Sequence, residues 1–129
     1  MFEGFGRGRI AAVQSWNLLE LETPEGSRSP IVLHSTEDAR AVLIGLNPGQ
    51  VLGDHQVHEN AYMVVVAGEV DVASSGDSVR AGPGTLFRFE ANERHRVSSE
   101  EGARILLLLA PWPGAGHYRG RGDSSGLGR

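Results

Sequence analysis

Turn glycines, a short apolar run and two histidines occur together in Gly49-Gln-Val-Leu-Gly-Asp-His-Gln-Val-His-Glu59. A second stretch, Gly84-Thr-Leu-Phe-Arg-Phe-Glu-Ala-Asn-Glu-Arg-His95, has the same order of glycine turn, strand and histidine. Around both stretches, glycines separate further short runs that are rich in Val, Ile, Leu and Phe. Turn residues at such intervals are typical of an all-β sandwich or barrel. We therefore predict an all-β fold, a small β-barrel.

Nine segments from residue 30 onward have strand character, and none is typical of a long helix. The expected strands are 31–34, 39–46, 50–57, 61–66, 69–74, 77–80, 85–89, 94–98 and 104–109. Within one of them, two-residue alternation places Phe87 and Phe89 on one face and Arg88 on the other, as in a half-buried sheet. The runs 62–66 and 105–109 are apolar on both faces. Such strands need a second cover, from the N-terminal segment or from another subunit.

The length of 129 residues indicates one domain, which we assign to residues 10–118. Residues 1–9 and 119–129 cannot bury enough apolar surface to offset the entropy of ordering, so they are predicted to be flexible tails. Residues 10–21 are expected to form a strand or a short turn along the barrel wall. After the last strand, Trp112 and the residues that follow it are expected either to fold across the barrel mouth, to pack on a neighbouring subunit, or to stay exposed.

Composition narrows the classes of partner. The net charge of -4 provides no general attraction to a phosphate backbone, so nucleic acid is not an expected partner. The longest apolar runs are far too short to span a membrane and no leader is evident, so we expect a cytoplasmic protein with no membrane contact. Because the chain has no cysteine, any metal ion must be held by His, Glu or Asp.

Strand parity makes two histidines candidates for one shared site. His55 shares its strand face with Val57, and His95 shares its face with Val97. Because these companions are apolar, both imidazoles are expected to face the barrel interior. Imidazole nitrogen is a good ligand for Zn, Fe, Mn or Ni, and three protein ligands with open positions are usual in a functional metal site.

The spacing of the glycines and histidines resembles the two signature motifs of the cupin superfamily. The matching positions are Gly49, His55, Gly68, Gly84 and His95. The resemblance covers roughly residues 30–110 and implies a jelly roll, or double-stranded β-helix. Several family positions are changed: Val57 stands at the second His and Ala61 at the Glu of the first motif, while Glu90, Asn92 and Ser99 stand at Pro, Gly and Asn of the second.

When the motif is aligned to this sequence without gaps, two of the four metal ligands that the resemblance implies are therefore replaced. A one-residue bulge would bring His58 to the place of the second histidine and Tyr62 to that of the glutamate. We predict His55, His58 and His95 as ligands of one divalent metal ion (Zn, Fe, Mn or Ni). Glu59, which shares strand parity with His55, and Tyr62 are predicted ligand-binding residues. No residue is assigned a catalytic role.

Three classes of function stay open, because a histidine among apolar residues is often a core residue whose hydrogen bonds are all made within the protein. In the first, a compact polar molecule binds in the barrel, with or without the metal, and undergoes metal- or His-assisted chemistry. In the second, a degenerate site binds or senses a metabolite without turnover. In the third, the barrel around His55 and His95 is filled by Met63, Phe87, Phe89 and side chains of the strand 105–109, and the protein acts through a dimer interface. Fold alone does not select among them, nor does it say whether the protein is an enzyme. The expected partners are a small polar molecule and a second copy in a homodimer.

Overall fold

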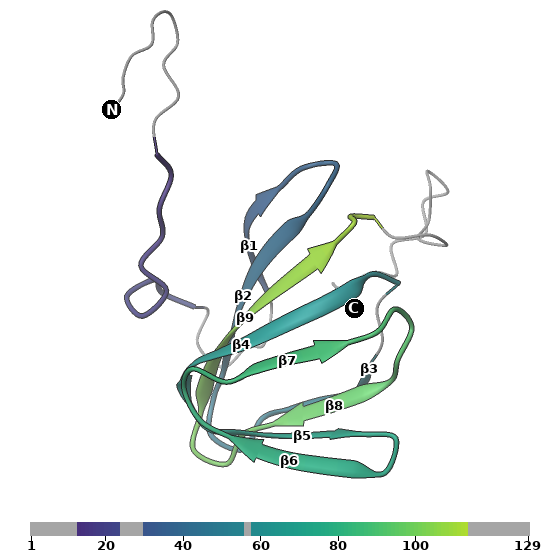
Figure 1. Cartoon of the computed structure of the whole chain (residues 1–129). Coiled ribbons are helices and arrows are strands. Elements are labelled where there is room, and N and C mark those ends of the chain that lie inside the picture. Colours follow the sequence, from purple (N-terminus) through teal and green to yellow (C-terminus); the bar gives the residue numbers. More distant parts are fainter. Residues whose placement is uncertain (1–12, 24–29, 56–57, 114–129) are drawn as a thin grey trace, which may run out of the picture.

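The computed structural model describes residues 13–23, 30–55 and 58–113 (Figure 1). These residues form nine strands and no helix. The strands are β1 (Ile31–Ser35), β2 (Arg40–Leu46), β3 (Val51–His55), β4 (Asn60–Gly68), β5 (Val70–Ser74), β6 (Asp77–Ala81), β7 (Leu86–Phe89), β8 (His95–Ser98) and β9 (Ala103–Ala110). Each predicted strand is present, and its observed ends lie within two residues of the predicted ones. Residues 56–57 of the predicted strand 50–57 lie outside the described part. Within the described ranges, no helix has the length and apolar character needed to cross a bilayer.

The strands form two antiparallel sheets that face each other, as Figure 1 shows. One sheet has the order β1-β2-β9-β4-β7 and the other has the order β3-β8-β5-β6. From β2 to β5 the chain alternates between the sheets, and it does so again from β6 to β9. This alternation gives the jelly roll, so the predicted all-β barrel is confirmed.

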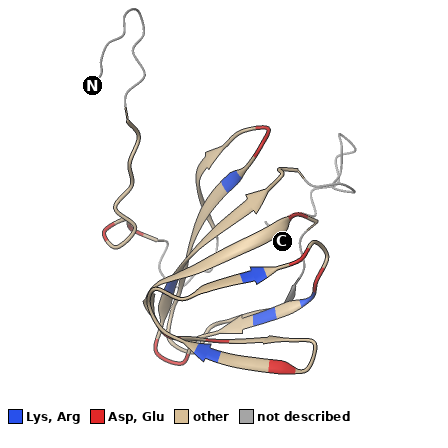
Figure 2. Cartoon of the chain, viewed as in Figure 1, with Lys and Arg blue, Asp and Glu red and all other residues tan. Residues whose placement is uncertain are grey.

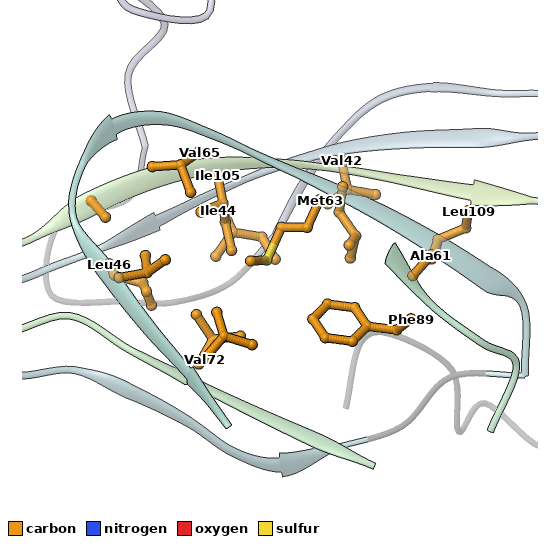
Figure 3. Packing of buried hydrophobic residues seen from close by; sticks show 14 of the residues in the cluster. Val42, Ile44, Leu46, Ala61, Met63, Val65, Val72, Phe89, Ile105 and Leu109 are labelled. Carbon is orange, nitrogen blue, oxygen red and sulfur yellow. The ribbon is translucent and has the colours of Figure 1, made fainter. Parts of the chain in front are cut away.

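Side chains of alternate residues fill the space between the sheets. In β9, Ile105, Leu107 and Leu109 are buried, whereas Leu108 between them is exposed. Figure 3 shows Met63 of β4, Phe89 of β7 and Val72 of β5 meeting in the same interior. Burial of one such large apolar side chain stabilises a fold by roughly 1.5–3 kcal/mol. The local alternation of the sequence is therefore what closes the two sheets around one core.

The two ends of the barrel differ in chemistry. At one end, which we call the turn end, Gly68 is the last residue of β4 and lies against Gly102, the residue before β9. At the other, the histidine end, β4 begins at Asn60 and β8 begins at His95. Two contacts connect these strand starts: Ala61 of β4 pairs with Phe89 of β7, and the Phe89 ring stacks on His95.

Residues 13–23, which we call the N-terminal arm, form a turn rather than a strand. The backbone oxygen of Asn17 accepts hydrogen bonds from the N–H groups of Glu20 and Leu21, at 3.0 and 3.1 Å. The arm is fastened to the five-stranded sheet where Arg104 Nη1 donates to the Leu18 carbonyl oxygen at 2.7 Å. The predicted tails, 1–9 and 119–129, lie outside the described residues.

Candidate functional site

The β3–β8 pair brings together two distant segments of the chain. His55 is the last residue of β3, His95 is the first of β8, and their backbones are direct cross-strand partners. A register irregularity between Leu52 and His55 precedes this pair. The side chain of His55 lies outside the described part of the structure, so its predicted role as a ligand stays a prediction.

His95 is a buried, neutral imidazole on the interior face of β8. Its side chain is 7% exposed, and its ring stacks on Phe89 with centroids 4.0 Å apart and planes 9° from parallel. Burial lowers the pKa of His95, because desolvation penalises the charged ring; the hydrogen bond to the Glu93 backbone and the charge of Glu93 oppose this only in part. Nδ1 lies 3.2 Å from the Glu93 carbonyl oxygen, which only accepts, so Nδ1 carries the proton. Nε2 is then the nitrogen with the lone pair.

Glu59 is a second ionisable side chain inside the same end of the barrel. It is 1% exposed and lies just before β4, in which Ala61 and Met63 are also buried. Ala61 is the cross-strand neighbour of Phe89, whose ring lies beside it in Figure 3. His95 therefore borders the Phe89 side chain directly, and Glu59 is buried two residues before Ala61, the cross-strand neighbour of Phe89.

His58 lies next to this pair and is held by the loop between β7 and β8. Its Nδ1 hydrogen-bonds Asn92 Oδ1 at 3.0 Å, and because an amide oxygen only accepts, Nδ1 is the donor. Asn92 has a φ of 67°, a left-handed conformation that asparagine tolerates better than most residues. His58 is half-buried, so it forms the rim of the site rather than its floor.

The loop that carries Asn92 is fixed by the carboxylate of Glu93. Glu93 Oε1 accepts from the Glu90 N–H at 2.9 Å, and Glu93 Oε2 accepts from the Ser74 hydroxyl at 2.6 Å. The Ser74 hydrogen bond is the main cause of a lowered pKa for Glu93, followed by the Glu90 N–H. These bonds tie the rim of the site to β5, which lies in the opposite sheet from β7.

Tyr62 is the one predicted site residue with a described side chain that the structure does not bring to the others. It is 37% exposed and lies between Ala61 and Met63, which both face the core. Strand alternation therefore turns Tyr62 to the outer face of the five-stranded sheet. The irregularity in β4 falls between Val65 and Ala67, well past Tyr62, and does not turn it inward.

The contacts of three residues near the site were not predicted from the sequence. The sequence places Phe89 in the core but does not predict that its ring stacks on His95. It identifies Asn92 only as the residue that stands at the position of a glycine in the family motif. The third, Trp112, is 8% exposed and belongs to the core cluster, with the guanidinium carbon of Arg40 3.9 Å from its ring centroid. An asparagine at a turn position was the available signal for Asn92, while nothing local marks the other two contacts.

The described side chains do not by themselves fit a metal ion. Among them, no three His, Asp or Glu residues lie in a group that could hold one. The predicted set of His55, His58 and His95 includes one side chain, that of His55, which lies outside the described part of the structure. Two described cavities, of about 290 and 400 Å³, lie at the turn end beside Gly68 and Gly102 and contain no predicted site residue.

Comparison with known proteins places this chain in a family. Residues 42–110, more than half of the sequence, match the family model described as a cupin domain. The chain belongs to the cupin family. No curated protein matches it.

Solved structures show the same fold at low sequence identity. A protein from Thermus thermophilus is 23% identical over 77% of this chain and 98% of its own, with a TM-score of 0.69. An RmlC-like cupin protein from Desulfovibrio desulfuricans is 23% identical over 78% of this chain and 98% of its own, with a TM-score of 0.67. KdgF from Halomonas sp. is 23% identical over 72% of this chain and 90% of its own, with a TM-score of 0.64. At these identities the likeness shows the fold alone.

Proposed function

We propose that this cupin domain binds a compact polar molecule at the histidine end of its barrel, through His95 and Glu59, with His58 at the rim. The observation that carries the proposal is the burial of two ionisable side chains at this end of the barrel: His95, which stacks on Phe89, and Glu59, which lies just before β4. Burying a polar group costs roughly 1–3 kcal/mol unless it is satisfied. Burial lowers the pKa of His95, and groups whose pKa is shifted by their surroundings cluster at functional sites.

The geometry also indicates which ligand groups suit the site. With its proton on Nδ1 directed to the Glu93 carbonyl oxygen, a neutral His95 presents Nε2 as a hydrogen-bond acceptor. The carboxyl group of Glu59 adds acceptor oxygens. We therefore expect the ligand to carry hydroxyl groups, which can donate to acceptors of this kind, rather than to be a fully deprotonated acid. The aromatic wall of Phe89 supports a small apolar surface on the same ligand.

A ligand-dependent thermal shift tests this proposal. At a concentration ten times Kd, a ligand stabilises the folded state by about 1.4 kcal/mol, which raises Tm by roughly 4–6 °C for a domain of this size. Protein purified without an affinity tag would be examined by native mass spectrometry for molecules that co-purify, and then screened against neutral sugars, polyols and hydroxy acids.

Conservative variants identify the site in the same assay. His95→Gln and Glu59→Gln are expected to remove the thermal shift, while circular dichroism confirms that both variants fold. His34→Gln and Glu37→Gln are the matched controls, because both residues are exposed and lie outside the site. A ligand that shifts His95→Gln and Glu59→Gln as much as the unmodified protein would contradict the proposal. Mass spectrometry of the ligand after incubation reports whether it is also converted.

The divalent metal ion that the resemblance implies, Zn, Fe, Mn or Ni, is a separate component of the proposal. It requires the His55 ring to join those of His58 and His95. Stoichiometric metal in the unmodified protein that is lost in both His55→Ala and His95→Ala would support it. Absence of metal from every preparation would contradict this component and leave ligand binding to the thermal-shift assay. A cytoplasmic location also stays a prediction, which cell fractionation tests.

A further inference from the structure

We infer that the turn end of the barrel holds a separate binding site, which takes a small organic carboxylate beside Arg104. The site is the cavity of about 290 Å³ that the N-terminal arm and the five-stranded sheet line together. Its lining residues include Thr23, Gly45, Asn47, Ala67, Gly102 and Arg104. The inference concerns the opposite end of the barrel from His95, so it goes beyond the proposed ligand-binding function.

Strand register leaves open space beside Arg104. Because its neighbours in β9, Ala103 and Ile105, are both buried, strand alternation turns Arg104 to the outer face of the sheet. Its cross-strand partners are Gly45 of β2 and Ala67 of β4. Directly opposite side chains of a sheet normally touch each other, but glycine has no side chain and alanine has only a methyl group. The volume that larger partners would fill therefore belongs to the cavity.

The N-terminal arm covers part of this space. Arg104 Nη1 donates to the Leu18 carbonyl oxygen at 2.7 Å. The Thr23 side chain lies over Gly45, where an added β-carbon would be 2.9 Å from Thr23 Cβ. Arg104 is half-buried as a result. A charge that is partly shielded from water attracts an opposite charge more strongly than a fully solvated one does.

Arg104 keeps both its positive charge and most of its donors for a ligand. A guanidinium has five N–H donors, and among the described residues the Leu18 carbonyl oxygen is the acceptor that Arg104 uses. No carboxylate of the described part of the chain lies within ion-pair distance of Arg104. Guanidinium groups bind carboxylates with two parallel hydrogen bonds. A ligand carboxylate would therefore supply the missing counter-charge.

The neighbouring cavity of about 400 Å³ offers no such charge, although Arg80 lines it. The guanidinium nitrogens of Arg80 lie 3.2, 3.8 and 3.5 Å from carboxylate oxygens of Glu69, Asp71 and Glu100. Figure 2 shows red on the turn between β8 and β9 and blue on the nearby end of β6. These surplus acidic groups disfavour a multiply charged anion at the turn end, because like charges repel. A monocarboxylate therefore suits the site beside Arg104 better than a phosphate does.

The size and lining of the cavity limit the rest of the ligand. Its volume of about 290 Å³ is at the small end of the range for ligand sites, which is about 300–1,000 Å³. Leu46 and Ala103 add apolar surface, and Thr23 and Asn47 have side chains that can donate to carboxylate oxygens. The expected ligand is a monocarboxylate with a short apolar chain.

An NMR titration with propionate at constant ionic strength tests the site, with neutral propionamide as the matched probe. Propionate has no hydroxyl group, so it differs from the ligand expected at the histidine end. We expect saturable shifts of the Arg104 Nε–H and of the Gly45 and Gly102 backbone N–H, and none at His95. Propionamide should bind at least tenfold more weakly, because it lacks the charge. Absence of saturable shifts, equal binding of the two probes, or tighter binding of inorganic phosphate would overturn the inference.

Two variants locate the binding in the same titration. Arg104→Met is expected to weaken propionate binding at least tenfold, whereas Arg96→Met, the matched control, should leave it unchanged because Arg96 is exposed on β8 in the other sheet. Since Arg104→Met also releases the Leu18 carbonyl, Thr23→Val serves as a second variant that keeps this bond and the side-chain shape. It should weaken binding about fivefold through the lost hydroxyl.

The same series separates this inference from the proposed function. Unchanged propionate affinity in either Arg104→Met or Thr23→Val would refute the site at the turn end. Loss of propionate binding in His95→Gln would also refute it, because the ligand would then occupy the histidine end. Propionate binding that persists in His95→Gln and is lost in Arg104→Met supports the inference whether or not a second molecule binds inside the barrel.

Discussion

Gly68 and Gly76 form a matched pair for a stability experiment. Both have a positive φ, 78° and 85°, but their surroundings differ. A β-carbon at Gly68 would overlap the Gly102 carbonyl oxygen and lie 2.8 Å from Ala103 Cα, and both are backbone atoms. A β-carbon at Gly76 would have nothing within 4 Å. Gly68→Ala and Gly76→Ala therefore share a conformational penalty, but only the first forces the backbone to move.

The expected losses of stability differ by about threefold. An L-residue in the left-handed region costs roughly 1–2 kcal/mol, offset in part by about 0.4–1 kcal/mol from the less flexible unfolded chain, so Gly76→Ala should lose about 1 kcal/mol. Moving Gly102 also disturbs the Ser99 hydroxyl, which accepts from the Gly102 N–H at 2.9 Å and donates to the Glu69 carbonyl at 2.6 Å. At about 1 kcal/mol for each hydrogen bond, Gly68→Ala should lose about 3 kcal/mol.

Urea denaturation of the two variants measures the difference. With a slope of about 2 kcal/mol per molar urea, the midpoint should fall by about 1.5 M for Gly68→Ala and about 0.5 M for Gly76→Ala. Crystal structures of both variants would show whether the β4–β5 and β8–β9 turns have separated. Equal losses in the two variants would refute the reasoning, because they would mean that position 68 needs glycine only for its φ.

Single interactions give three further predictions. Because burial lowers the pKa of His95, the unfolded chain binds a proton at this residue before the folded chain does as the pH falls. The contribution of His95 to the free energy of unfolding should therefore be complete above about pH 6.5 and decline below it. The denaturation midpoint of His95→Gln should vary less over that pH range. The lowered pKa of Glu93 acts in the same direction at lower pH: its contribution is present above about pH 4.5 and lost below it, and Ser74→Ala should reduce this acid dependence in the same titration. Arg40→Met removes the cation over Trp112 and should cost about 0.5–2 kcal/mol, with a change in tryptophan emission; an unchanged Tm and spectrum would show that the contact contributes nothing.

Much of the fold could be predicted because it follows from neighbours along the chain. The alternation of Phe87, Arg88 and Phe89 shows which side of β7 faces inward without reference to any other strand. His95 and Val97 share the buried face of β8 for the same reason. Glycines between the runs mark where the chain turns, and their spacing together with the histidines was enough to indicate the cupin family.

Which residues form the site depends on contacts between segments that are far apart in the sequence, and no local sequence pattern predicts those contacts. Glu59 faces the core and Tyr62 faces outward because β4 begins at Asn60, a start point set by pairing with Ala110 of β9. If the pairing of β4 were shifted by one residue, Glu59 would face outward and Tyr62 would face the core, since side chains alternate at every residue. Asn92 meets His58 only because the β7–β8 loop folds over the start of β4.

The sequence by itself determined the nine strands and their inward faces, because strand alternation and turn formation are local properties of the chain. Only the tertiary structure decided that the backbones of His55 and His95 pair, that Tyr62 lies outside the barrel, and that Trp112 is buried under Arg40. The physical reason is that cross-strand register and side-chain stacking arise between residues far apart in sequence, whose relative positions are set by packing of the whole core.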